Sequence, residues 1–227
     1  FSIASVGFFL PKFILLPMLR FVPKRVIFRL PKTVIDAKKK VVALTFDDLP
    51  YCGGESFRES LNLLNKYNMK STLFVIAEDL SERNFDLLVD CVKTGHQLAN
   101  HGITESTHAF KSKQEIQKEI TDCDKAIADI YAKANIPIPK TKFYRPGGGL
   151  INFSTMSPDF IGDHLIALGS VYPHDPFSTN DWVNFQLITA KLAPRDIVIL
   201  HDRSWTPKLL ERLLPFMKTN QFESLTL

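Results

Sequence analysis

Short apolar runs alternate with longer amphipathic segments along most of this chain. The short runs predict strands, and the longer segments, which carry apolar residues every three or four positions, predict helices. The expected strands cover residues 41–46, 72–76, 97–100, 143–145, 165–170 and 197–200, with a short one near 224–227. The expected helices cover residues 55–67, 82–93, 113–134, 181–192 and 207–219. Strands that alternate with helices in this way indicate β/α units around a parallel sheet.

The number of strands favours a closed or nearly closed β/α barrel in a single domain, with an open doubly wound sheet as the alternative. The 227 residues, of which 45% are hydrophobic and 23% charged, are sufficient for one large domain with a sizeable core. In such barrels the chemistry takes place at the carboxyl ends of the strands. Polar residues at those ends are therefore the first candidates for a functional site.

Charge and cysteine content exclude some functions. The net charge is +4 and the basic residues are scattered, so no nucleic-acid partner is expected. Three cysteines, at positions 52, 91 and 123, allow at most one disulfide within the chain and fit no zinc-ribbon spacing. The oligomeric state is not indicated by any of these features.

The first 38 residues differ from the domain expected over residues 39–227. Residues 1–18 are strongly apolar but interrupted by Pro11 and Pro17, and a membrane span needs roughly 20 uninterrupted apolar residues. We interpret this segment as an arm packed on the domain, with the flank of a membrane anchor or signal segment, or an interfacial segment, as alternatives. Association with a membrane through the arm stays open, and a secreted or membrane-anchored protein with an extracytoplasmic domain is favoured.

Polar residues follow most of the expected strands. The first strand ends in Asp47 and Asp48, and later strands end in His101, Arg145 and His201. Two adjacent carboxylates are costly to crowd together unless a cation, a hydrogen-bond network or a shared proton stabilises them. An isolated Asp-Asp pair is usually a solvated turn, but acids, histidines and an arginine that converge on one rim favour a catalytic site.

These residue types are suited to a hydrolytic metal site. A divalent first-row ion needs about three protein ligands and one open position for water. Asp48 and His101 are the first two candidates, and Glu105, four residues after His101, is the third. His108 is the alternative third ligand, although it also fits an exposed residue at the start of a helix. Water bound to such an ion becomes a nucleophile near neutral pH.

The remaining polar residues suggest how protons would move. Asp47 is a candidate base beside the metal carboxylate, and His201 is a candidate general acid because imidazole titrates in the right range. Arg145 would orient Asp47 through a charge-assisted hydrogen bond. Gly147 and Gly148 follow Arg145, and glycines there would let backbone N–H groups approach an oxyanion closely.

At these positions the chain resembles the polysaccharide deacetylase family, also called the NodB-homology family or carbohydrate esterase family 4. The resemblance covers about residues 39–227. Thr45-Phe46-Asp47-Asp48 matches the first family motif, His101 the second, Arg145-Pro146 the third and Leu200-His201 the last. It implies a distorted (β/α)7 barrel, Asp47 as base, Asp48 as metal ligand and His201 as acid. The metal that it implies is Zn²⁺, with Co²⁺ or Ni²⁺ as alternatives.

The chain also departs from the family pattern. Glu105 stands where the second ligand histidine falls, and the usual fourth motif is replaced by residues 172–176. Within that segment Asp175 is the candidate carboxylate that orients His201, and His174 is a candidate to line the cleft. Tyr172 and Trp205 are candidates to stack on a sugar ring, whereas Trp182 is expected in the core.

We therefore expect a metal-dependent hydrolase that removes acetyl groups from polysaccharide containing N-acetylglucosamine. Chitin, chitooligosaccharide and peptidoglycan are the candidate substrates. One alternative is a hydrolase of the same superfamily that acts on a small amide. The other is a weakly active or inactive homologue that binds glycan, which the altered motifs suggest.

Overall fold

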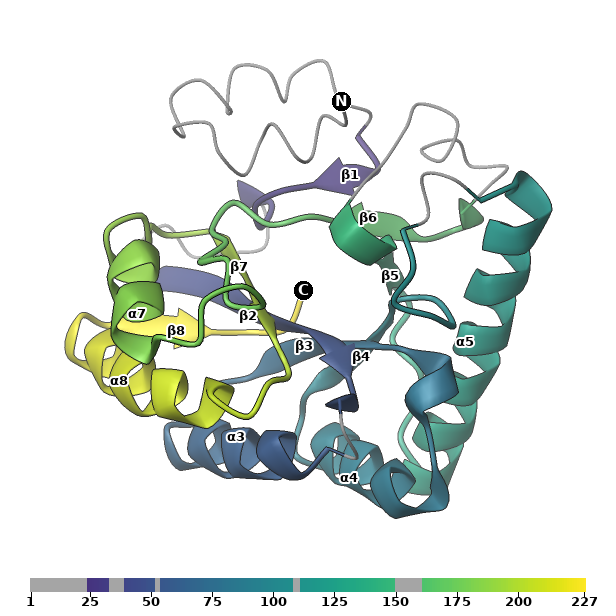
Figure 1. Cartoon of the computed structure of the whole chain (residues 1–227), viewed down its shortest axis with the longest axis horizontal. Coiled ribbons are helices and arrows are strands. Elements are labelled where there is room, and N and C mark those ends of the chain that lie inside the picture. Colours follow the sequence, from purple (N-terminus) through teal and green to yellow (C-terminus); the bar gives the residue numbers. More distant parts are fainter. Residues whose placement is uncertain (1–23, 33–38, 52–53, 108–110, 150–160) are drawn as a thin grey trace.

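A parallel sheet runs through the centre of the molecule in the computed structural model (Figure 1). The structure describes residues 24–32, 39–51, 54–107, 111–149 and 161–227. The strands are β1 (Val26–Ile27), β2 (Lys40–Leu49), β3 (Ser71–Val75), β4 (Gln97–Asn100), β5 (Phe143–Tyr144), β6 (Leu165–Ala167), β7 (Ile197–His201) and β8 (Phe222–Ser224). Neighbouring strands follow the order β1-β6-β5-β4-β3-β2-β7, and β8 pairs with β2.

The sheet curls until β7 meets the segment that follows β6. Val171 forms a parallel bridge with Val198 of β7, and the Ile199 N–H donates to the Val171 carbonyl at 2.9 Å. On its other side, β7 pairs with β2 in parallel register. Strands β2 to β7 therefore surround a common interior, which confirms the expected β/α barrel in a single domain.

Helices cover the outer face of the sheet (Figure 1). They are α3 (Glu55–Lys66), α4 (Glu82–Lys93), α5 (Lys113–Ala134), α7 (Asp181–Thr189) and α8 (Thr206–Thr219), with short 3-10 turns η4 (Ala77–Asp79) and η6 (Gly147–Gly149). Side chains alternate along β2: Val42 and Leu44 belong to the large core cluster shared with the helices, and Val41 and Ala43 belong to a separate cluster. Both faces of β2 are thus buried, as in other parallel sheets.

The predicted elements agree with the structure where the periodicity is strong. Strand β4 and helices α4 and α5 have the predicted bounds, and α7 ends at Thr189 rather than at residue 192. Strand β1 was not predicted, because two residues are too short to show a pattern. Backbone contacts define it instead: Ile166 N–H donates to the Arg25 carbonyl and Leu168 N–H to the Ile27 carbonyl, both at 2.8 Å.

Part of the expected N-terminal arm lies against the barrel. The Leu30 N–H donates to the Arg195 carbonyl at 2.8 Å, and the Arg29 side chain lies 3.1 Å from Asp196. Residues 1–23 and 33–38 lie outside the described residues, so the membrane-related alternatives for the arm stay predictions. None of the helices that the structure describes is long and apolar enough to cross a bilayer.

Two further expectations concern single residues. The prediction that Trp182 is a core residue is wrong, since it is 53% exposed. It lies in the first turn of α7, whose buried positions are Asn184 and Ile188. Cys91 and Cys123 are buried and unpaired with each other, whereas Cys52 lies outside the described residues.

Candidate active site

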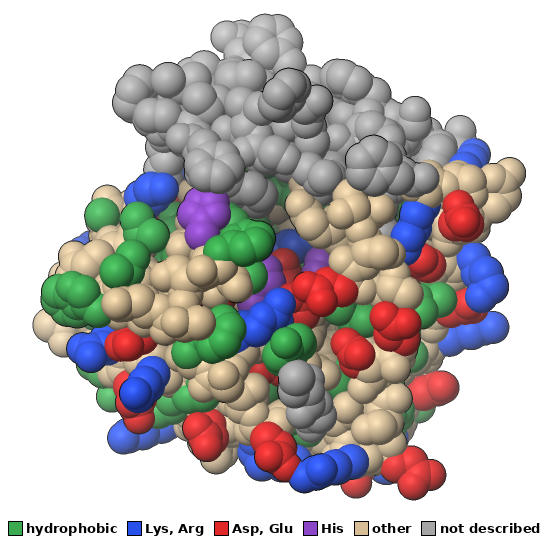
Figure 2. All heavy atoms as spheres, in the orientation of Figure 1, with side chains coloured by type: hydrophobic (Ala, Val, Ile, Leu, Met, Phe, Trp, Pro, Cys, Tyr) green, Lys and Arg blue, Asp and Glu red, His purple; other side chains and the backbone are tan. Residues whose placement is uncertain are grey.

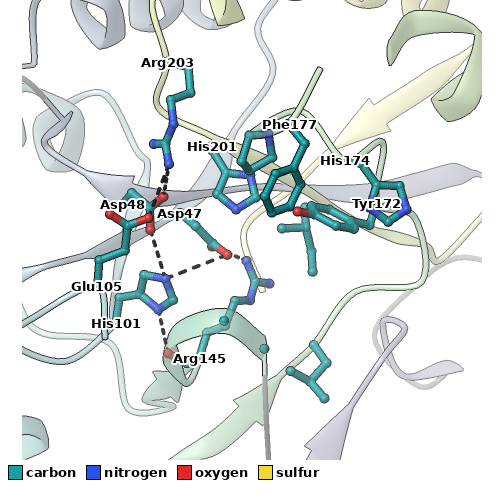
Figure 3. A pocket seen from close by; sticks show the side chains of 15 residues that line it. Asp47, Asp48, His101, Glu105, Arg145, Tyr172, His174, Phe177, His201 and Arg203 are labelled. Carbon is teal, nitrogen blue, oxygen red and sulfur yellow. Dashed lines mark hydrogen bonds and ion pairs between the residues drawn. The ribbon is translucent and has the colours of Figure 1, made fainter. Parts of the chain in front are cut away.

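A cleft of about 330 Å³ opens at the carboxyl ends of the strands. Figure 2 shows acidic, basic and histidine side chains meeting near the middle of the face in view. All of the predicted catalytic and metal-ligating residues except Asp175 line the cleft, together with Tyr172, His174, Phe177 and Arg203 (Figure 3). The structure thus brings together side chains at the carboxyl ends of β2, β4, β5 and β7 that are far apart in the sequence.

Both carboxylates of the Asp47–Asp48 pair reach this cleft because the backbone of β2 changes direction between them. Adjacent side chains on a regular strand point to opposite faces. Here Asp48 has a left-handed conformation with φ of 63°, and the register between β2 and β3 shifts between Phe46 and Leu49. Aspartate tolerates this conformation better than most residues. The irregularity acts as a bulge that directs both side chains into the cleft.

Asp47 is held by a buried arginine. The Nη1 of Arg145 donates to Asp47 Oδ1 and, at 3.0 Å, to Thr45 Oγ1, while its Nε donates to the Ala167 carbonyl at 2.7 Å. The guanidinium also lies 3.9 Å from the centre of the Phe74 ring. Arg145 is 1% exposed, so its position is determined by these contacts rather than by solvent. Loss of this contact would leave an uncompensated charge in the interior, which is strongly destabilising. The pairing therefore holds both side chains in place.

His201 is held by a second carboxylate. Its Nδ1 donates to Asp175 Oδ1 at 2.9 Å, and its backbone N–H donates to Asp175 Oδ2 at 2.8 Å. Burial lowers the pKa of His201, but the charges of Asp175 and Asp47 raise it by more, so the pKa lies above its ordinary value. His201 is therefore suited to carry a proton at neutral pH and to present Nε2 to the cleft.

His101 faces Asp48 with a defined tautomer. Its Nδ1 lies 2.6 Å from the Arg145 carbonyl oxygen, which can only accept, so Nδ1 carries a proton. Its Nε2 is then left to face Asp48 Oδ1 at 3.3 Å. Burial lowers the pKa of His101, but the charges of Asp47 and Asp48 raise it by more. This arrangement would accommodate either a proton on Nε2 or a cation between the two groups.

The donor chemistry of Asp48 and His101 fits a divalent first-row ion, because a ligand histidine usually has its other ring nitrogen anchored in this way. The third predicted ligand is placed differently. Glu105 is 62% exposed, and its Oε1 lies 3.6 Å from the Nη2 of Arg203. Among the described residues, no three histidine, cysteine or acidic side chains are grouped closely enough to hold an ion.

Only some of the predicted substrate-binding residues line the cleft. Gly148 and Tyr172 line the cleft, and the Tyr172 ring lies 4.4 Å from the His174 ring, centre to centre. Gly147 is buried, and a Cβ there would lie 2.5 Å from the Ser106 carbonyl oxygen. Trp205 does not line the cleft, and its indole N–H donates to the Asp175 carbonyl at 3.2 Å. His108 lies outside the described residues, so its role as a ligand stays a prediction.

Arg203 has no predicted role, although the structure places it beside the metal-binding candidates. Its Nη2 donates to Asp48 Oδ2 at 2.6 Å. The available signal was its position two residues after His201, at the carboxyl end of β7. Position alone does not reveal which acid an arginine contacts, so the pairing was not predicted.

Comparison with known proteins agrees with this fold. The sequence profile of the polysaccharide deacetylase family matches residues 35–157, more than half of the chain. A peptidoglycan-N-acetylglucosamine deacetylase of Bacillus cereus is 27% identical over 198 residues, which cover 83% of this chain and 86% of that protein. The chain spans less than half the length of some other deacetylases that it matches.

Solved structures show the same similarity. The Xyl-CE4 domain of a multidomain xylanase from the hindgut metagenome of Trinervitermes trinervoides is 25% identical, with a TM-score of 0.72 over 83% of this chain and 88% of that one. A CE4 family pseudoenzyme from Bacillus anthracis has the same fold, with a TM-score of 0.72 at 21% identity over 89% of this chain and 67% of that one.

The fold and the cleft define a single-domain α/β barrel with its polar residues at the carboxyl ends of the strands. With the profile match, this chain belongs to the polysaccharide deacetylase family.

Proposed function

We propose that this protein is a metal-dependent hydrolase that removes N-acetyl groups from glycans containing N-acetylglucosamine, such as chitooligosaccharide or peptidoglycan. The observation that carries the proposal is the register of β2 and β7, in which Asp47 and His201 are paired neighbours on adjacent strands. Asp47 is held by Arg145 and His201 by Asp175. A base and an acid are thus held side by side, each by a partner of opposite charge.

Each residue has a distinct part in the proposed reaction. Asp47 accepts a proton from the water that attacks the acetyl carbonyl carbon, and Arg145 keeps its carboxylate oriented toward the cleft. His201 donates its Nε2 proton to the nitrogen as the C–N bond breaks, which leaves acetate and a free amine. Asp175 holds the Nδ1–H throughout, so the neutral imidazole keeps the correct tautomer.

A divalent ion, when bound, would acidify the attacking water and polarise the acetyl carbonyl. Asp48 and His101 are the residues that would hold it, with Glu105 as the proposed third ligand. Zn²⁺ suits imidazole and carboxylate donors, and Co²⁺ and Ni²⁺ are alternatives. Zinc titration of Glu105→Ala and His108→Ala tests the third ligand: weaker binding in His108→Ala alone would replace Glu105 with His108.

The experiment that tests the function measures acetate release from N-acetylated chitooligosaccharides and from peptidoglycan, with Zn²⁺, Co²⁺ or Ni²⁺ added. We expect Asp47→Asn to lose at least about 100-fold in rate, since a general base contributes 10² to 10⁴. Asp129→Asn is the matched control, because Asp129 is exposed on α5. If Asp47→Asn does not fold, His201→Gln takes its place in the comparison. The proposal is wrong if the metal-loaded protein releases acetate from neither glycan, or if Asp47→Asn and Asp129→Asn are equally active.

A second candidate is an inactive homologue that binds glycan. The contact of Arg203 with Asp48 and Glu105 favours it, because two of the proposed ligands are already engaged by a cation. Glycan binding without acetate release in the same assay would support it. We also propose an extracytoplasmic location, which suits a polysaccharide substrate; the location of a tagged full-length protein tests it.

A further inference from the structure

Arg203 lies between two of the residues that would bind the metal. Its Nη2 donates to Asp48 Oδ2 at 2.6 Å and lies 3.6 Å from Glu105 Oε1 (Figure 3). The other oxygen of Asp48 faces His101 Nε2 at 3.3 Å. Both oxygens of this carboxylate are therefore engaged, one of them by a permanent positive charge.

The position of this guanidinium is fixed by contacts on several sides. It lies over the Tyr51 ring, 4.2 Å from the ring centre, and its Nη1 donates to the Asp202 carbonyl at 2.8 Å. The backbone N–H of Arg203 donates to Thr206 Oγ1 at 3.2 Å, at the start of α8. Arg203 is only 6% exposed. A charge buried to this degree is costly unless it is paired, and its partner here is Asp48.

Both carboxylates of the Asp47–Asp48 pair already have an arginine partner. Arg145 pairs with Asp47, and Arg203 pairs with Asp48. A divalent ion on Asp48 would share that carboxylate with the guanidinium, and two cations on one carboxylate repel each other strongly in a buried site. An ion held by Asp48 Oδ1 and His101 Nε2 would lie beside the guanidinium on Oδ2, and this repulsion opposes its binding.

We propose that Arg203 is an internal competitor of the divalent ion, which lowers the affinity of this site by occupying Asp48 and Glu105. The inference rests on the proposed metal-dependent function and adds a residue that sets the metal affinity. The guanidinium on Asp48 Oδ2 opposes an ion on Oδ1 through the repulsion between two cations on one carboxylate. The site therefore needs a higher metal concentration for half-saturation than the same ligands would need without Arg203.

Calorimetric titration of the full chain with Zn²⁺ at pH 7, after treatment with a chelator, tests this. We expect Arg203→Gln to bind Zn²⁺ at least tenfold more tightly than the wild type, equivalent to about 1.4 kcal/mol. Arg203→Lys keeps the charge but loses the planar fork, so its affinity should fall between the two. Arg212→Gln is the control, because Arg212 pairs with Asp181 on the surface and does not line the cleft.

Circular dichroism establishes that each variant is folded before its titration is interpreted. Equal or weaker Zn²⁺ binding in folded Arg203→Gln would overturn the proposal, as would the same gain in Arg212→Gln. If Arg203→Gln does not fold, the comparison of Arg203→Lys with the wild type decides, and equal affinities would count against the proposal. Acetate release is a separate readout: tighter Zn²⁺ binding in Arg203→Gln without any deacetylation supports the role of Arg203 and contradicts the proposed function.

Discussion

Replacement of Asp175 by asparagine removes the charge that orients His201 and hardly changes the size of the side chain. Asp175 accepts two hydrogen bonds from His201, one from Nδ1 and one from the backbone N–H, at 2.9 and 2.8 Å. Asparagine has a single side-chain oxygen, so it can satisfy only one of them. The imidazole then loses its fixed orientation, or the backbone N–H of His201 loses its buried partner.

The expected loss follows from the role of His201 as acid. General acid catalysis contributes about 10² to 10⁴ in rate, so loss of its orientation should lower kcat at least 100-fold, equivalent to about 2.7 kcal/mol. The pKa of His201 should also fall, because burial lowers it and Asp175 is the nearest charge that raises it. An acid must be protonated to act, and a lower pKa means that activity is lost at a lower pH. The basic limb of the kcat profile should therefore move to lower pH.

The assay is acetate release from a chitooligosaccharide at saturating Zn²⁺, with kcat and KM measured between pH 5 and 10. KM should change little, because Asp175 does not line the cleft. Asp196→Asn is the matched control, since Asp196 is also fully buried but lies at the opposite end of β7. An unchanged kcat, or a lower kcat with the basic limb in its wild-type place, would refute the reasoning.

Two further predictions concern stability, measured by urea unfolding. Burial lowers the pKa of His96 to about 4, whereas in the unfolded chain the imidazole takes up its proton near pH 6.5. The free energy of unfolding should therefore fall by up to about 3 kcal/mol as the pH drops from 6.5 to 4. His96→Gln should unfold with a weaker pH dependence in that window, and an identical dependence would contradict this account. Gly169→Ala would place a Cβ 2.4 Å from Ile199 Cγ1 and should cost about 1–3 kcal/mol. In the Ile199→Ala background, Gly169→Ala should cost less unfolding free energy than in the wild type, because the clashing Ile199 atoms are absent. An equal cost in both backgrounds would argue against the clash.

Much of the fold could be predicted because its signals are local. The apolar spacing of α5 and the short run of β4 give their bounds directly from neighbouring residues. Strand β1 and the exposure of Trp182 could not be predicted in this way. The former depends on backbone contacts with β6, and the latter on which side of α7 meets the barrel.

For the cleft, the sequence by itself determined that Asp47, Asp48, His101, Arg145 and His201 lie at strand ends, because the strand signals precede them directly. In a parallel barrel those ends share one rim. The resemblance to a known family then assigned a chemical role to several of these residues.

Only the tertiary structure decided how these groups contact one another. The bulge at Asp48 brings two adjacent carboxylates into one cleft, and the register of β2 and β7 pairs Asp47 with His201. The tertiary structure also brings the Arg203 guanidinium into hydrogen-bonding contact with Asp48, although the two residues are 155 positions apart. Such contacts depend on strand register and local backbone geometry, and neither has a signature in the spacing of residues along the chain.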